Sequence, residues 1–568
     1  MTQAIRKTAP GGLKPVPFQI PQPYITQLDN GLKVVIFEDK RLPLVSFRLA
    51  FLAGDATDPL DTIGLNSAMA GMLTEGTATY SSRELAEKIE RLGASISGNS
   101  SDDFTIIAAS SLSIYSSEIF QLFAEIVFRP SFPEEELDLY RRNAVENIKF
   151  QRSQPGFLAN EQTARILYGD HPYSRVAPSA ADIEKLTREA LGKAHERLLV
   201  PNNAILVVVG DVEREEFLSE VKEQFGFWER GESGAPRFAG PPERDRRTMT
   251  IVDRPGSAQA NIVLANIAMN RNNPDYFAVT VMNQVLGAGA SSRVFMNLRE
   301  EKGYTYGAYT RLDTRLLAGD FEATAEVRTA VTGDSLHEFF YELDRIRNER
   351  VSDDELTDAK NFLTGVFPIR AETQEGLTNL IVNQQLYRLP TDYLQTYREN
   401  VDSISAEDVQ RVANKYILPE MLAIVIVGDA GEVLPQVKKY CDVIEVFDTE
   451  GNAMDVSGFE IDADEEPGSV AGQWDLSLDF QGQKVQVTLV LEQHGEKVAG
   501  TIETILGNGQ IKEGKVRGDK VNATASTEIQ GQAVDFVISA SVKGERMTGT
   551  LSTAIIPDSL AFEGKRRS

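Results

Sequence analysis

The chain has 568 residues, of which 42% are hydrophobic and 25% are charged. This length and composition predict several buried cores and exclude a disordered protein for most of the chain. The net charge of -26 argues against nucleic acid and against anionic membranes as partners, because either would require a basic surface.

Histidine and cysteine are too scarce for a local metal motif. The single cysteine, Cys441, excludes an intrachain disulfide. The nearest two of the four histidines, His171 and His195, are 24 positions apart, so no short two-histidine zinc motif is available.

Residues 1–22 are predicted to form an N-terminal tail. They contain no apolar run of signal-peptide length, and no stretch of 18 uninterrupted apolar residues occurs in the sequence. We therefore expect a soluble, cytoplasmic protein without a membrane partner.

Residues 23–230 mix strand and helix patterns without regular alternation, which is typical of an α+β sandwich. Ser81 and Glu84 have the spacing of a capping box, which predicts a helix that ends at Gly93. The expected strands are residues 31–37, 45–53 and 105–112, and further helices are expected at residues 119–128 and from residue 132 onward.

Residues 64–77 read GLNSAMAGMLTEGT. This segment resembles the inverted zinc motif of the pitrilysin and mitochondrial processing peptidase family, which runs Gly-Leu-x-His-x-x-Glu-His-Met-x-x-x-Gly-Thr. In the family the two histidines bind zinc and the glutamate activates water. Here the histidine positions hold Ser67 and Gly71, and the glutamate position holds Ala70.

The same resemblance places the family's third zinc ligand, a glutamate, at Asn147 in this chain. The neighbouring Glu146 is expected to point to another side of the helix. Because a protonated serine and an amide are poor zinc ligands and the other two positions offer none, we expect no zinc and no other cofactor in this chain. The chain alone is therefore predicted not to be a zinc peptidase.

An internal repeat with an offset of 218 residues indicates two duplicated halves. Pro201 and Pro419 are followed by similar apolar runs, each of which ends in Val-Gly-Asp, and Thr187 and Ser405 both have the features of a helix N-cap. The Gly- and Pro-rich residues 231–246 are expected to link the first half to a second half at residues 247–447.

Residues 286–306 resemble the family segment that faces the zinc from across the chamber. The resemblance implies that Arg299 and Tyr306 contact the substrate backbone and the tetrahedral oxyanion, since both side chains can donate hydrogen bonds to a carbonyl oxygen. It also implies that a flexible loop contacts bound peptide, through Gly287, Gly289, Ser291 and Ser292. Alternatively, Arg299 only pairs with Glu300 or Glu301, and Tyr306 packs within a strand.

The last part of the chain changes in character. Residues 448–470 are acidic and aperiodic, which predicts a linker, and residues 471–568 alternate apolar and polar residues, which predicts a small β-barrel or sandwich. Gly507-Asn-Gly509 is expected to form a turn. We recognise no family for this region, which could bind an apolar ligand or a partner or simply have a packed interior.

The resemblance covers about residues 22–445 and implies two halves, each of two α+β sandwich domains, which form a clamshell. It further implies a non-catalytic subunit that completes a peptide-binding chamber with a homologous partner, which carries zinc on an intact His-x-x-Glu-His motif. Two alternatives remain open. The chain could be a catalytically inactive scaffold or assembly subunit, or a peptide-holding module that uses its C-terminal β-domain for recognition.

Overall fold

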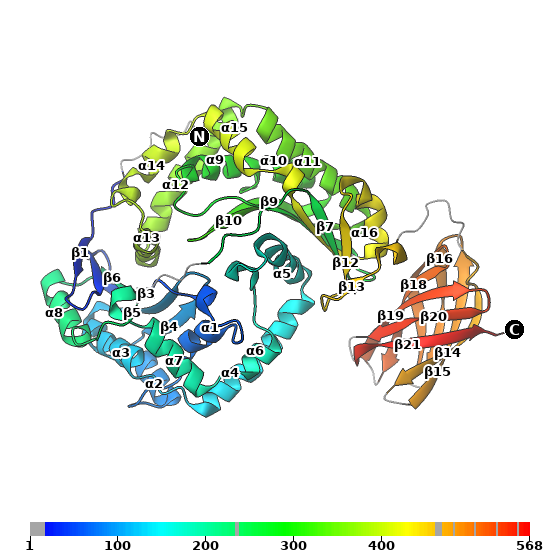
Figure 1. The fold of residues 1–568 in the computed structure, drawn as a ribbon, viewed down its shortest axis with the longest axis horizontal. Coiled ribbons are helices and arrows are strands. Elements are labelled where there is room, and N and C mark those ends of the chain that lie inside the picture. Colours follow the sequence, from blue (N-terminus) through cyan, green and yellow to red (C-terminus); the bar gives the residue numbers. More distant parts are fainter. Residues whose placement is uncertain are drawn as a thin grey trace, which may run out of the picture.

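The computed structural model describes residues 18–232, 238–459, 468–480, 483–504, 507–529, 532–553 and 556–567. Parts of the predicted tail and of both predicted linkers, residues 1–17, 233–237 and 460–467, lie outside the described residues. Figure 1 shows two similar halves that face each other, followed by a separate barrel beside the second half. This arrangement confirms the predicted α+β fold with duplicated halves and a C-terminal β-domain.

The first half is built on a six-stranded sheet with strand order β1-β2-β6-β3-β5-β4. The strands predicted from apolar runs correspond to β2, β3 and β5, and the predicted capping box is present at the start of α2. The strands are β1 (Tyr24–Gln27), β2 (Lys33–Glu38), β3 (Leu44–Phe51), β4 (Ser95–Ser100), β5 (Thr105–Leu112) and β6 (Ala204–Gly210). The α-helices are α1 (Leu65–Met72), α2 (Ser82–Arg91), α3 (Ser116–Phe128), α4 (Glu134–Ser153), α5 (Pro155–Tyr168), α6 (Ala180–Glu184), α7 (Arg188–Leu198) and α8 (Arg214–Phe225).

The second half repeats this plan on a seven-stranded sheet with strand order β13-β12-β7-β11-β8-β10-β9. Its strands are β7 (Thr248–Asp253), β8 (Gln259–Ile267), β9 (Thr305–Thr314), β10 (Gly319–Arg328), β11 (Ala423–Gly428), β12 (Ile444–Phe447) and β13 (Ala453–Met454). Its α-helices are α9 (Tyr276–Leu286), α10 (Arg293–Phe295), α11 (Thr332–Asn348), α12 (Asp353–Glu372), α13 (Gln374–Leu386), α14 (Tyr393–Asp402), α15 (Ala406–Tyr416) and α16 (Ala430–Val437).

The duplication is visible in the strand pairing. In the first half, β6 pairs parallel to β2 and antiparallel to β3. In the second half, β11 pairs parallel to β7 and antiparallel to β8 in the same way. The helices that precede these two strands begin at the predicted N-caps, where Thr187 accepts a hydrogen bond from the Ala190 amide and Ser405 accepts one from the Asp408 amide.

The halves exchange one helix each, so each sheet is covered on its second face by a helix from the opposite half. Helix α5 of the first half buries Leu158 and Leu167 in a cluster with Val252, Val425 and other residues of the second sheet. Figure 1 shows α5 between the halves and α13 close to β3 and β6.

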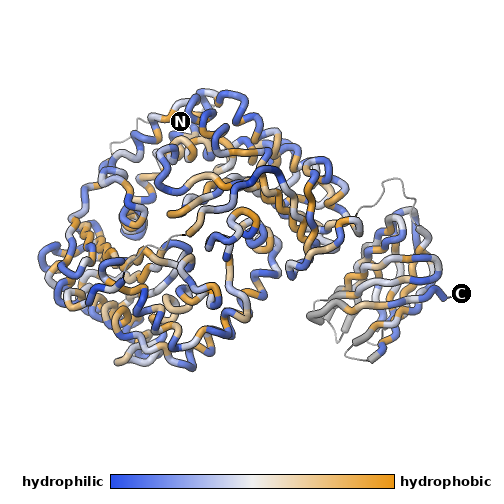
Figure 2. Tube along the Cα trace, viewed as in Figure 1, coloured by the Kyte–Doolittle hydropathy of each residue, from blue (hydrophilic) through white to orange (hydrophobic). Residues whose placement is uncertain are grey.

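Helix α13 of the second half makes the reciprocal contact. It buries Leu377 and Ile381 in a cluster with Val35, Val207 and other residues of the first sheet. Figure 2 shows hydrophobic residues along the central strands that these helices cover. Each fully buried Leu or Ile contributes about 1.5–3 kcal/mol, so separating the halves would expose two apolar sheet faces.

The C-terminal domain is a closed eight-stranded antiparallel barrel, in which β14 pairs with both β15 and β21. The buried Trp474 donates its indole N–H to the Val470 carbonyl at 2.9 Å, and the Arg566 guanidinium lies 4.7 Å from its ring centroid. The strands are β14 (Gly472–Phe480), β15 (Gln483–His494), β16 (Lys497–Thr504), β17 (Gly507–Arg517), β18 (Lys520–Ile529), β19 (Gln532–Lys543), β20 (Arg546–Thr553) and β21 (Ile556–Arg566).

The turn predicted at Gly507-Asn-Gly509 is wrong, because these residues begin strand β17. Gly507 pairs with Thr504 and Gly509 pairs with Ile502 across the β16–β17 ladder, so both glycines belong to the strand. Elsewhere in the fold, none of the helices in the described part of the chain is long and apolar enough to cross a membrane.

Candidate functional site

The structure brings two of the four degenerate zinc-motif positions to one cavity. Ser67 on α1 and Asn147 on α4 both line a cavity of about 380 Å³ in the first half. Glu146 does not line this cavity. It is exposed and forms an ion pair with Lys149 at 2.8 Å, so it points to another side of the helix than Asn147, as predicted.

The other two positions of the degenerate motif, Ala70 and Gly71, pack closely against neighbouring residues. A side chain at Gly71 would meet the Tyr140 ring, whose Cε2 atom lies 3.8 Å from the place of a Cβ. Ala70 is fully buried, and its carbonyl oxygen lies only 2.2 Å from where a Cβ on Gly98 would be. Helix α1 therefore lies tightly against β4, with an aromatic ring beside the second histidine position.

These residues do not fit a zinc ion. The Ser67 hydroxyl donates a hydrogen bond to Asp55 Oδ2 at 2.6 Å, so it keeps its proton and is a poor ligand. Among the residues that the structure describes, no group of three or more His, Cys, Asp or Glu side chains is placed to hold a metal ion.

The cavity has a buried acidic end. Asp55 and Asp102 line it, and Asp58 lies behind, where its carboxylate accepts hydrogen bonds from the Gly64 and Asn66 amides at 2.7 and 3.0 Å. Burial raises the pKa of Asp55, and burial together with the Asp55 charge raises the pKa of Asp58 to about 7.

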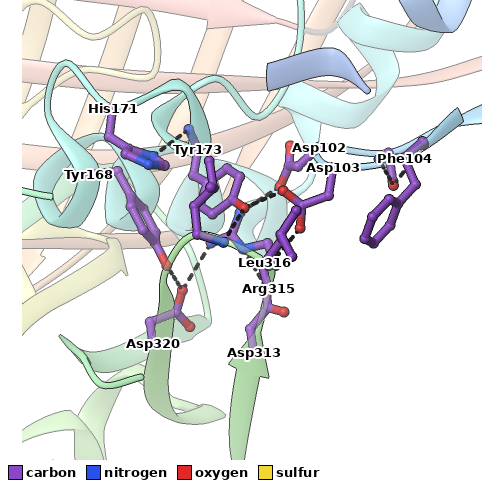
Figure 3. A network of polar contacts seen from close by, with 12 residues as sticks. Asp102, Asp103, Phe104, Tyr168, His171, Tyr173, Asp313, Arg315, Leu316 and Asp320 are labelled. Atoms are coloured by element: carbon purple, nitrogen blue, oxygen red, sulfur yellow. Dashed lines mark hydrogen bonds and ion pairs between the residues drawn. The ribbon is translucent and has the colours of Figure 1, made fainter. Parts of the chain in front are cut away.

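A second group of charges, shown in Figure 3, joins the two halves beside this cavity. Arg315, in the turn between β9 and β10, makes ion pairs with Asp102 of the first half at 2.6 Å and with Asp320 of its own half at 3.2 Å. The guanidinium also lies over the Tyr173 and Tyr168 rings, at 4.0 and 4.7 Å from their centroids. We call Arg315 and these four partners the Arg315 network.

Further hydrogen bonds at the same place cross between the halves. Tyr168 donates its hydroxyl proton to Asp320 at 2.5 Å, and the Leu316 amide donates to Asp103 at 2.8 Å. Tyr173 donates to Asp103 and accepts from the Leu317 amide at 3.2 Å. The nearby His171 accepts a hydrogen bond from the Tyr173 amide at 3.2 Å and caps a short 3-10 helix, which is a structural role.

Arg299 and Tyr306, the predicted substrate contacts, lie in the second half, and both are exposed. Arg299 is on a π-helix, Met296–Glu301, a rare geometry that is frequent at functional sites. Its guanidinium lies 3.3 Å from Glu300 and 4.9 Å from the Phe295 ring centroid. Tyr306 is 88% exposed on β9, which is an edge strand of its sheet.

The neighbouring loop residues are mostly used for local structure. A Cβ at Gly287 would lie 2.4 Å from the Thr310 amide nitrogen, so glycine is needed for this close approach. Gly289 accepts a hydrogen bond from the Ser292 hydroxyl at 2.5 Å, and Ser292 is buried, whereas Ser291 is exposed. Among the described residues, no hydrogen bond or ion pair joins Arg299 or Tyr306 to the cavity.

Sequence reasoning missed Asp55, Tyr140 and Arg315. Asp55 lies in a short 3-10 helix, Asp55–Thr57, 12 positions before Ser67, and Asp102 and Arg315 are 213 positions apart, so neither pairing has a spacing signal. Only the fold brings these side chains together.

Two family models match the chain. The model described as insulinase, peptidase family M16, matches residues 33–177, and the model described as peptidase M16 inactive domain matches residues 185–363. The two matches together span more than half of the chain and one match lies largely in each half.

Three individual proteins show the same similarity. An uncharacterized zinc protease of Bacillus subtilis is 22% identical over 50% of this chain and 68% of its own length. A non-peptidase homolog of Helicobacter pylori is 22% identical over 67% of this chain and 88% of its own length. The crystal structure of a peptidase M16 inactive domain from Pseudomonas fluorescens superposes with a TM-score of 0.67 and 26% identity, covering 72% of this chain and 98% of that one.

Proposed function

From the premise that this chain belongs to the M16 peptidase family, as a catalytically inactive member, we propose that it is the non-catalytic subunit of a heteromeric zinc peptidase. In this role it completes a peptide-binding chamber with a homologous partner that carries an intact His-x-x-Glu-His motif. Zinc bound to that partner would activate the water that attacks the peptide bond.

The observation that carries this proposal is the contrast between the two halves. The first half has no usable zinc ligand at Ser67, Ala70, Gly71 or Asn147. The second half keeps Arg299 and Tyr306 at the family's spacing, with Tyr306 88% exposed on an edge strand. A tyrosine used only for packing would be expected to be buried, so its exposure favours contact with another molecule.

The chain's own residues would contribute in two ways. As an edge strand, β9 can accept an extended peptide as a further strand beside Tyr306. It cannot do so at Thr310, whose amide donates to the Gly287 carbonyl at 3.0 Å and whose carbonyl accepts from the Asn283 side chain at 3.3 Å. Arg299 and Tyr306 can then donate hydrogen bonds to a substrate carbonyl oxygen, whose negative charge grows as the partner's water attacks. The exposed Ser291 and the loop from Gly287 to Ser292 lie on the same segment and are proposed to contact the peptide.

One observation favours a second candidate, a scaffold or assembly subunit without a part in hydrolysis. The Arg299 guanidinium already has partners in Glu300 and Phe295, as expected of a structural arginine. In this case the chain would still bind its partner, but Arg299 would be dispensable.

The two candidates are distinguished by purifying the chain with its stoichiometric partner and measuring hydrolysis of an unfolded peptide. For the shared chamber, Arg299→Ala lowers kcat about 100-fold or more without loss of assembly, because one oxyanion donor accounts for about 2.7–4 kcal/mol. The matched control is Arg83→Ala, which also removes an exposed helical arginine with one carboxylate partner, Glu87 at 2.9 Å. Equal activity of both variants, or a partner without the zinc motif, would exclude the shared chamber. The scaffold role would then be the remaining candidate.

A further inference from the structure

Two buried polar side chains lie beneath the segment that carries Arg299, and the proposal above gives them no role. They are Arg293, whose side chain is 4% exposed, and Asn297, which is also buried. Helix α10 and the π-helix Met296–Glu301 follow each other without a break, and α10 lies beside β9 and α11 (Figure 1). The same short segment therefore has a buried polar side and an exposed side, which includes Met296 and Arg299.

Arg293 ties this segment to α12. Its guanidinium forms a two-pronged ion pair with Glu355, in which Nε and Nη2 lie 2.7 and 3.0 Å from the two carboxylate oxygens. Glu355 is in the first turn of α12 and also accepts hydrogen bonds from the Ser352 amide and hydroxyl, both at 2.9 Å. Arg293 lowers the pKa of Glu355 to about 2, so the pair stays charged at neutral pH. A fork of this kind fixes direction as well as distance.

Asn297 ties the same segment to α11. Its side-chain amide donates to Glu338 at 3.0 Å and to Glu342 at 2.9 Å. Lys302, directly after the π-helix, adds an ion pair with Glu338 at 2.9 Å. Residues two positions apart do not share a helix face, so Arg299 faces away from the contacts of Asn297. The segment is thus held from its buried side by two helices, while Arg299 projects from the other side.

The geometry of the π-helix makes the direction of Arg299 depend on these anchors. The Lys302 amide donates to the Asn297 carbonyl, five positions back, at 3.0 Å, and the Tyr304 amide donates to the Leu298 carbonyl, six positions back, at 2.9 Å. Such widened turns are rare in proteins and are frequent at functional sites. A slip of one residue toward ordinary α-helical pairing would turn the side chains of this segment by about 100°.

Holding the segment in this way leaves polar atoms unsatisfied. Arg293 Nη1 and Asn297 Oδ1 are buried and have no hydrogen-bond partner among the residues that the structure describes. Such atoms cost folding free energy, and a segment that served stability alone could avoid them with apolar residues of similar size. Their presence favours a role in fixing the geometry of the turn.

We propose that Arg293 is a positioning residue, whose ion pair with Glu355 holds the π-helix in the register that directs the Arg299 guanidinium outward. Arg293 itself is buried and touches no substrate. Its effect on hydrolysis rests on the proposed function, whereas its effect on the π-helix is a property of this chain alone.

The first measurement uses the full chain without any partner. Hydrogen exchange of the amides of residues 302–304, followed by mass spectrometry, reports how firmly the π-helix is held, because these amides donate to carbonyls within it. Arg293→Met keeps a long side chain and removes the fork. It is expected to speed this exchange roughly tenfold or more.

The matched control is Arg152→Met. It breaks a similar fork in the first half, where Arg152 lies 2.7 and 3.3 Å from the two carboxylate oxygens of Glu161. This variant is expected to leave the exchange of residues 302–304 unchanged. Exchange in Arg293→Met equal to that of the wild type, or the same increase in both variants, overturns the proposal.

The second measurement uses the complex with the zinc-bearing partner and an unfolded peptide. Arg293→Met is expected to lower kcat about tenfold or more and to leave KM within about twofold, because a displaced donor is lost mainly in the transition state. In the Arg299→Ala chain the same substitution is expected to have no further effect, since nothing is left to position. Effects that multiply would show general damage to the structure and overturn the proposal.

Glu355→Gln covers the case in which Arg293→Met does not fold. Glutamine can still accept a hydrogen bond from the Ser352 amide, so α12 keeps its capping box, whereas the fork loses its negative charge. Exchange of residues 302–304 is expected to become faster in this variant too. Unchanged exchange would overturn the proposal.

The two proposals fail in different ways. If Arg299→Ala itself leaves kcat unchanged, the shared-chamber function is wrong, and the exchange measurement alone decides whether Arg293 holds the π-helix. If Arg299→Ala lowers kcat and Arg293→Met does not, the shared chamber stands and the role of Arg293 is wrong.

Discussion

Replacing Arg315 by methionine tests whether the Arg315 network holds the two halves together. The substitution keeps the long side chain and removes the charge from between Asp102 and Asp320. The Asp320 side chain is 4% exposed, and it would lose its cation in a place that water does not reach. Asp102 is 31% exposed and would be partly solvated, so losing its ion pair with Arg315 adds less to the destabilisation.

The expected cost is about 3 kcal/mol. Removing one partner of a buried ion pair costs about 3–5 kcal/mol, because a charge stays buried without compensation. Burial and the neighbouring Glu322 already raise the pKa of Asp320 to about 7, so this carboxyl can protonate when Arg315 is lost, which places the cost at the low end. The figure of about 3 kcal/mol includes the lost attraction of the guanidinium to the Tyr168 and Tyr173 rings, about 0.5–1 kcal/mol each, because methionine keeps the packing on these rings.

Hydrogen exchange measured by mass spectrometry reports this change locally. The Leu316 and Leu317 amides donate to Asp103 and Tyr173 of the other half, so they exchange when the halves separate at this point. A cost of about 3 kcal/mol corresponds to exchange that is roughly 150-fold faster.

The control is Arg83→Met, which removes an exposed ion pair on α2 and should leave this exchange unchanged. An increase of less than about fivefold in Arg315→Met would refute the reasoning, since the guanidinium would then contribute only about 1 kcal/mol to closure.

Two further predictions concern the degenerate motif. Asp58 has a pKa of about 7 in the folded chain, above the ordinary 3.8, so it stabilises the fold at low pH and this contribution is lost as the pH rises from about 4 to about 7. Urea unfolding should therefore show Asp58→Asn gaining about 2 kcal/mol relative to the wild type between pH 5 and pH 7, and a constant difference would contradict the raised pKa. Gly98→Ala should lose about 1–3 kcal/mol in the same assay, because its Cβ would lie 2.2 Å from the Ala70 carbonyl oxygen, whereas Gly192→Ala, with open space around it, should be neutral or stabilising.

Local features of the fold were predictable because their signals are local. The capping box of Ser81 and Glu84 is a contact between residues three positions apart, and it is present as expected. The apolar runs of β6 and β11 are buried along their whole length, which their composition indicated. The prediction of a turn at Gly507-Asn-Gly509 was wrong because these glycines lie in a strand. Glycine is needed there for close packing, since a Cβ at Gly509 would lie 2.7 Å from the Ser526 carbonyl oxygen.

The exchange of α5 and α13 between the halves had no such signal. Helix α13 is buried among residues of the opposite half. The pattern of its apolar residues does not indicate which of the two sheets the helix covers. A helix can satisfy the same hydrophobic pattern against any apolar face, so the choice depends on the chain path and not on the helix itself.

The sequence by itself determined that the zinc ligands are absent, that the chain is duplicated and that a β-domain follows, because each of these is a matter of which residue stands at which position. Only the tertiary structure decided what occupies the emptied site. Tyr140 lies beside Gly71, Asp55 binds Ser67, and Asp102 meets Arg315 across 213 positions. The energies of such contacts depend on distance and burial, and these exist only once distant segments have been brought together.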